Sequence, residues 1–294
     1  MKRAVFLYLG YSLYINLSGF DSQQGKVDSQ DLYPSTSHSI PAWIKSMKIL
    51  SILFPLLFFT SVKANKATIV FLIAEREYRT DETLPVFAKE KLGAKYTTRY
   101  CMAEKEGSNR HVLKNAGAIE SAHLLFISVR RRAFSDKTMG MIRKHVADGK
   151  PVIGIRTASH AFALRKETPP DGHGTWDEWD KKIMGGNYDG HYGRGKPCRV
   201  DRFPSIPDHP ILKNLKLPFE TPASLYRNSP LPAESVPLLR GTIEGAPPEP
   251  LAWTNRSPSG GRVFYTSLGH VEDFKKPAFN KLLLNAVQWC LEKK

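Results

Sequence analysis

Short apolar runs, each followed by a cluster of polar residues, recur along most of this 294-residue chain. Runs of this length between turn residues are typical of strands that are buried inside a sheet. Such strands are predicted at residues 66–74, 95–101, 123–129, 151–155 and 261–267.

Helical patterns separate these strands. One can be capped by Thr80 or Asp81 and closes at Gly93, and a second is capped by Ser135 and Asp136 and closes at Gly149. Residues 161–164 resume a helix-compatible pattern, and Pro277 opens a final helix with a wide apolar stripe. This alternation predicts an α/β fold with a doubly wound, mostly parallel sheet.

The stretch from residue 197 to residue 260 differs because it is rich in proline. Its strand candidates are short, and we expect them to form a small, irregular antiparallel extension or edge strands. They lie at residues 225–227, 236–241 and 250–254.

Polar clusters follow three of the predicted parallel strands, at residues 75–78, 130–132 and 156–160. Right-handed crossovers bring the carboxyl ends of such strands to one edge of the sheet. Open α/β folds bind their ligands at that edge. We therefore expect these three clusters to meet around one crevice.

Residues 185–195 contain five glycines together with Tyr188, His191 and Tyr192. A backbone of this kind can approach a ligand closely, and the rings can contact it. The common glycine-rich phosphate-binding patterns are absent, so nothing in the loop indicates a nucleotide. An ordinary surface loop is the alternative interpretation.

The N-terminus carries targeting signals rather than a globular pattern. A basic start at Met47, an apolar run over residues 49–59 and Val62-Lys63-Ala64 are typical of a secretory signal peptide cleaved after Ala64. The run is too short for a stable membrane span. Residues 1–46 hold a second apolar patch and a polar, aperiodic stretch, so we expect a start codon placed too early and a disordered segment. A membrane anchor at residues 4–17 is the alternative.

The formal net charge is +15, and it falls to +12 without residues 1–64, which hold six basic and three acidic residues. The basic residues are scattered, so no nucleic-acid partner is expected, although polyanion binding stays an alternative. Cys101, Cys198 and Cys290 are too few and too far apart for a zinc cluster or a disulfide framework.

Several blocks of residues resemble the ThuA-like, or trehalose utilization, family over about residues 66–291. They are E-x-E-Y at 75–78, G-I-R-T-A-S-H-A-F at 154–162, G-G-N-Y-D-G-H-Y at 185–192, H-P-I-L at 209–212, S-L-Y-R at 224–227, G-R-V-F-Y-T-S-L-G-H at 261–270 and N-A-V-Q-W at 285–289. The resemblance implies one domain over residues 65–294. It also implies the flavodoxin-like sandwich of class I glutamine amidotransferases.

Glutaminase activity is not expected. In those amidotransferases, the turn equivalent to Gly154-Ile155-Arg156 carries a nucleophilic cysteine, and this chain has Arg156 there. Ser159 beside His160 could suggest a serine hydrolase, but a serine at the start of a helix is better suited to capping.

His160, His191 and His270 all fall within the matching blocks. Three converging imidazoles could bind zinc with an open position. They could also act in proton transfer or bind a sugar without metal. No local metal-binding motif decides between these readings, and a structural role is the third.

The resemblance implies disaccharide metabolism, in which ThuA-like proteins accompany dehydrogenases that make 3-keto glycosides. We expect lyase or hydrolase chemistry on such sugars. A non-catalytic sugar-binding module and a homo-oligomer stay open. The expected catalytic residues are His160, His191, Arg156 and Glu75; the expected substrate-binding residues are Tyr78, Glu77, Arg130, Tyr188, Tyr192 and His270.

Overall fold

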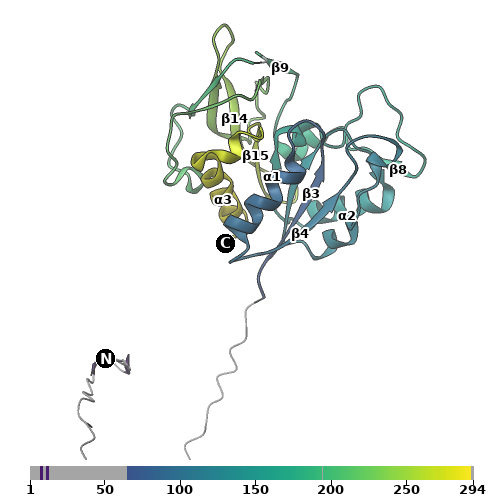
Figure 1. The fold of residues 1–294 in the computed structure, drawn as a ribbon, viewed down its shortest axis with the longest axis horizontal. Coiled ribbons are helices and arrows are strands. Elements are labelled where there is room, and N and C mark those ends of the chain that lie inside the picture. Colours follow the sequence, from purple (N-terminus) through teal and green to yellow (C-terminus); the bar gives the residue numbers. More distant parts are fainter. Residues whose placement is uncertain (1–6, 9–10, 13–64, 194, 293–294) are drawn as a thin grey trace, which may run out of the picture. The chain divides into compact units, whose positions relative to one another are not determined.

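The computed structural model describes residues 7–8, 11–12, 65–193 and 195–292 (Figure 1). The chain divides into two units, Met1–Ser61 and Val62–Lys294. In the first unit, β1 (Leu7–Tyr8) pairs with β2 (Tyr11–Ser12) antiparallel. The expected signal peptide at residues 47–64 and most of the expected disordered segment lie outside the described residues.

The second unit is built on a nine-stranded sheet of order β11-β10-β13-β14-β15-β7-β5-β3-β4. The five strands from β15 to β4 are parallel, and the pairs from β15 to β11 are antiparallel. The strands are β3 (Thr68–Ala74), β4 (Thr97–Met102), β5 (Leu124–Val129), β7 (Val152–Ile155), β10 (Cys198–Arg202), β11 (Phe219–Thr221), β13 (Val236–Thr242), β14 (Glu249–Arg256) and β15 (Arg262–Thr266).

Two small ribbons accompany this sheet. β6 (Phe134–Ser135) pairs with β8 (His173–Gly174), and β9 (His191–Tyr192) pairs with β12 (Leu225–Tyr226). The second ribbon ties the glycine-rich loop to the S-L-Y-R block.

The sheet lies between two helical layers (Figure 1). Helices α1 (Thr80–Phe87) and α3 (Pro277–Leu291) pack on one face, and α2 (Asp136–Ala147) packs on the other. Side chains of β3 alternate between the layers: Phe71 joins the first core and Leu72 the second. The predicted α/β fold with a flavodoxin-like, mostly parallel sheet is confirmed.

Short helical turns complete the unit. They are Ala88–Leu92, Ser108–His111, Ala116–Ser121, Arg156–His160, Trp179–Met184, Pro210–Leu212 and Asp273–Lys275. None of the helices among the described residues is long and apolar enough to cross a membrane.

The helix expected at residues 161–164 is wrong. Only the single turn Arg156–His160 follows β7. The carbonyl groups that would continue it accept hydrogen bonds from elsewhere: the His160 carbonyl from the Arg131 N–H (3.1 Å) and the Ala161 carbonyl from the Arg132 N–H (2.8 Å). Because those acceptors are taken, the chain leaves as a loop.

Candidate functional site

A cavity of about 520 Å³ opens at the carboxyl ends of the parallel strands. The three polar clusters predicted to meet there all contribute to it. The expected site residues that line it are Glu77, Tyr78, Arg130, Arg156, His160, Tyr188, His191 and His270. Segments more than 190 residues apart thus share one wall, as the topology predicted.

Arg156 occupies the sharp turn that ends β7, with the left-handed φ of 48°. This conformation costs an L-residue roughly 1–2 kcal/mol. One contact holds the turn: the Tyr265 hydroxyl donates to the Arg156 carbonyl (2.5 Å). Two residues earlier, the backbone at Gly154 packs so closely on Met184 that a Cβ there would lie 2.5 Å from the Met184 sulfur. The position therefore has the shape of a nucleophile turn but presents a guanidinium.

The Arg156 side chain is buried and largely used by the protein itself. Its Nη1 donates to the carbonyls of Ser224 (3.0 Å) and Ser267 (2.6 Å), and its Nη2 donates to the Ser224 hydroxyl (2.9 Å). Its guanidinium carbon lies 4.1 Å from the ring centre of Tyr226 and 4.8 Å from that of Tyr78. Arg156 therefore joins the cavity walls. It contributes positive charge to the cavity, but most of its N–H groups are already used by the protein.

His160 lies beside this arginine with only 7% of its surface exposed. The Ser159 hydroxyl lies 3.0 Å from Nδ1 of His160. This hydrogen bond gives Ser159 a structural role, so no nucleophilic role is needed to explain its position. Burial, followed by the charges of the surrounding arginines, holds the pKa of His160 well below its ordinary value. His160 is therefore a neutral imidazole that can donate or accept a hydrogen bond.

Tyr188 stacks on His160, with ring centroids 4.6 Å apart and planes 23° apart. Its backbone N–H donates to Oδ2 of Asp180 at 2.7 Å. Burial raises the pKa of Asp180 to about 7. The Asp180 carboxylate thus positions the loop that brings Tyr188 over the imidazole.

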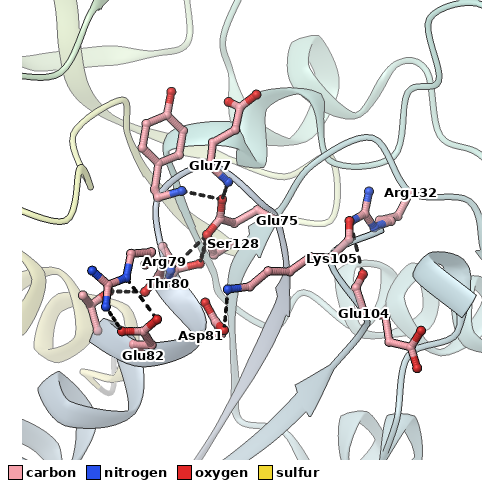
Figure 2. A network of polar contacts seen from close by, with 12 residues as sticks. Glu75, Glu77, Arg79, Thr80, Asp81, Glu82, Glu104, Lys105, Ser128 and Arg132 are labelled. Atoms are coloured by element: carbon pink, nitrogen blue, oxygen red, sulfur yellow. Dashed lines mark hydrogen bonds and ion pairs between the residues drawn. The ribbon is translucent and has the colours of Figure 1, made fainter. Parts of the chain in front are cut away.

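Glu75 has a different environment from the one we expected. Its carboxylate accepts hydrogen bonds from the N–H groups of Glu77 (2.5 Å), Tyr78 (2.9 Å) and Thr80 (2.9 Å), and from the Thr80 hydroxyl (2.8 Å) (Figure 2). It does not line the cavity. Glu75, rather than Thr80 or Asp81, supplies the cap of α1. It therefore has a structural role and is not one of our candidate catalytic residues.

Glu77 points away from Glu75 (Figure 2), and its carboxylate lies 2.9 Å from Nη2 of Arg130. This ion pair forms part of the cavity lining. Tyr192 does not line the cavity: it packs against the core on the α1 and α3 side, because neighbours in a strand point to opposite faces and its neighbour His191 faces the cavity.

Of the three alternatives for the histidines, the zinc site has no support in the geometry. Within the described residues, no group of three His, Cys, Asp or Glu side chains could hold a metal ion. His160, His191 and His270 share the cavity without forming a ligand set. The three cysteines are free and buried.

Four lining residues with polar or aromatic side chains were not among the expected site residues: Arg131, Arg165, Ser224 and Tyr226. The S-L-Y-R block contained two of them, but nothing in its pattern indicated that β12 would pair with β9. The cluster at residues 130–132 was expected at the crevice, and Arg131 does line it, but Arg132 is instead buried against the carbonyls of Glu104 and Lys105.

Comparison with known proteins gives a consistent picture. Residues 66–290 match the family model ThuA, described as trehalose utilisation. No curated protein matches. A ThuA-like protein from Bacteroides uniformis aligns with a TM-score of 0.55 at 16% identity, covering 79% of this chain and 94% of that one. One from Parabacteroides merdae aligns with a TM-score of 0.52 at 14% identity, covering 77% and 90%. The structures support the fold, and the family match covers most of the chain: this protein belongs to the ThuA family.

Proposed function

We propose that this protein acts on oxidised carbohydrate, cleaving the glycosidic bond of 3-keto glycosides in the cavity at the carboxyl edge of the sheet. The observation that carries the proposal is the joint lining of one sugar-sized space by aromatic rings, neutral His160 and several arginines. Cavities of roughly 300–1,000 Å³ hold small ligands. The family's description points to the same class of substrate.

The lining offers complementary contacts for a sugar. Tyr188 and Tyr78 present aromatic rings, which can cover the apolar face of a pyranose. The positive potential of Arg156 and its neighbours stabilises negative charge that develops on a carbonyl oxygen. No thiol lines the cavity among the described residues, which suits elimination better than acyl transfer.

The chemistry follows from the ketone. A carbonyl at C3 acidifies the C2–H bond, and a base takes that proton while the electron pair forms an enediolate. The pair then forms the C1–C2 double bond, the C1–O bond breaks, and the leaving oxygen takes a proton from an acid. Water added to the product completes a net hydrolysis. His160, whose imidazole is neutral, is our candidate for the base, and His191 is our candidate for the acid.

Incubation of the full chain with methyl 3-keto-β-D-glucopyranoside tests this directly. We expect methanol release in excess of the uncatalysed rate and no release from methyl β-D-glucopyranoside. His191→Ala should abolish turnover and leave the melting temperature nearly unchanged. His123→Ala is the matched control, because His123 is exposed at the opposite edge of the sheet.

Other outcomes would redirect the assignment. Saturable sugar binding without product would make the protein a binding module. Binding of a long polyanion that weakens steeply with salt, without sugar binding, would favour the polyanion alternative. A large loss of stability in His191→Ala would make that residue structural.

We also propose that the protein is exported, with Met47 as the start and cleavage after Ala64. The support is the sequence of residues 47–64 alone. Sequencing the N-terminus of the mature protein from its native host tests this, and a mature chain that begins upstream of Met47 would contradict it.

A further inference from the structure

The charges around the cavity are not balanced. Four guanidinium groups line it against one carboxylate, that of Glu77, which pairs with Arg130. Within the part of the chain that the structure describes, no carboxylate forms an ion pair with Arg131, Arg156 or Arg165. An excess of cationic side chains in a recessed site favours an anionic ligand.

Arg131 is held in place at some cost. Its φ is 49°, a left-handed conformation that a glycine would adopt without strain. Its N–H donates to the His160 carbonyl, and its Nη1 donates to the Ala163 carbonyl at 3.1 Å. Its Nε is buried without a partner. Strained residues persist where surrounding contacts fix them, often at ligand sites.

Arg165 complements Arg131 from the rim. It follows the segment that carries Ala163 and is exposed, yet it lines the same cavity. Burial lowers the pKa of Arg131, and the positive charge of nearby Arg165 lowers it further. Their mutual repulsion is relieved when an anion lies between them.

Arg156 cannot serve the same purpose. Four of its hydrogen bonds go to Ser224, Ser267 and Tyr78, so its N–H groups are committed to the walls. Arg131 and Arg165 have fewer contacts with the protein and keep N–H groups available for a ligand.

We propose that the sugar bound in this cavity carries an oxyanion substituent, a carboxylate or a sulfate ester, and that Arg131 and Arg165 bind it. The sugar part of this statement rests on the proposed function. Guanidinium groups suit this task because their planar fork of donors matches the geometry of a carboxylate or sulfate. The substrate class is then an acidic glycoside rather than a neutral disaccharide.

Calorimetric titration of the full chain with three matched ligands tests the proposal: methyl β-D-glucuronide, methyl β-D-glucopyranoside 6-sulfate and methyl β-D-glucopyranoside. We expect at least one anionic ligand to bind about 10- to 100-fold more tightly than the neutral one, as charge-assisted hydrogen bonds provide. The better anion identifies the substituent.

Arg165→Gln should remove most of that preference for the anionic ligand over the neutral one. Arg99→Gln is the matched control: Arg99 is an exposed arginine on β4 outside the cavity, and its loss lowers the net charge equally. Since Arg165 is exposed, its replacement leaves the fold intact. Arg131→Lys keeps the positive charge and loses the planar pair of guanidinium donors. It should also weaken binding of the anionic ligand.

Equal affinity for all three ligands would overturn the oxyanion proposal and leave the proposed function standing. Equal effects of Arg165→Gln and Arg99→Gln would overturn it too, because the preference would then reflect overall charge. Binding of sodium sulfate without binding of any of the three glycosides would overturn the proposal that the oxyanion belongs to a sugar, whereas methanol release from the 3-keto glycoside tests the proposed function separately.

Discussion

The guanidinium carbon of Arg156 lies 4.1 Å from the ring centre of Tyr226, although 70 positions separate them in the chain. The contact joins the end of the parallel half of the sheet to the small ribbon formed by β9 and β12. One buried cation therefore connects the wall that carries His160 to the wall that carries His191.

Replacing Arg156 with lysine should destabilise the protein by about 2–4 kcal/mol, because an ammonium cannot satisfy both serine carbonyls and the Ser224 hydroxyl. Lysine keeps the charge and bears the same backbone strain, so the change in stability reports the loss of the guanidinium hydrogen bonds. Urea denaturation measures the loss. Arg165→Lys on the rim should change the stability by less than about 0.5 kcal/mol, and equal losses in both variants would contradict the assignment.

Glu75→Gln should cost about 2 kcal/mol, since the amide nitrogen cannot accept two of the four hydrogen bonds that the carboxylate receives. Glu77→Gln is the paired control. Its ion pair with Arg130 is partly exposed and contributes about 0–1 kcal/mol. The free energies of unfolding of the two variants decide the matter: a milder effect at position 75 than at position 77 would show that the turn does not depend on Glu75.

Asp180 should make the folded state less stable as the pH rises. Burial raises its pKa from 3.8 to about 7 in the folded protein, so the folded state binds the proton more tightly than the unfolded chain does. Its contribution is therefore present below about pH 4 and is lost as the pH rises through about 7. Asp180→Asn should flatten this part of the pH profile, measured as unfolding free energy from pH 4 to 8.

The same change bears on Tyr188. Asparagine keeps an oxygen that can accept the Tyr188 N–H, so the loop and its stacking on His160 should persist. Asp180→Leu removes that acceptor and should weaken ligand binding. An unchanged pH profile in Asp180→Asn would show that the carboxylate is not the titrating group.

His160 should respond to its arginine neighbours. Removing one positive charge favours the protonated imidazole, so Arg165→Gln should raise the pKa of His160, and so should a bound anion. Histidine NMR titration follows this directly. Because the folded pKa is depressed, His160 also contributes stability that is lost as the pH falls below its unfolded pKa of about 6.5. A pKa that stays fixed in Arg165→Gln would contradict the coupling.

Much of the fold was predictable because its determinants are local. The apolar runs that became β3, β5, β7 and β15 end in polar residues, and Ser135 caps α2 by accepting from the Thr138 N–H as its position indicated. The antiparallel extension was expected, but β10 and β11 were not identified, since proline-rich flanks and partly exposed faces leave little hydrophobic periodicity.

By itself, the sequence determined that three polar clusters would meet at one edge of a parallel sheet, because handed crossovers leave no other arrangement. Only the tertiary structure decided what each side chain does there. Glu75 turned to its own backbone, Tyr192 to the core, and Arg131 to the cavity. Strand patterns fix which edge a residue reaches, whereas its direction depends on which distant groups compete for its hydrogen bonds, and those partners meet only after folding.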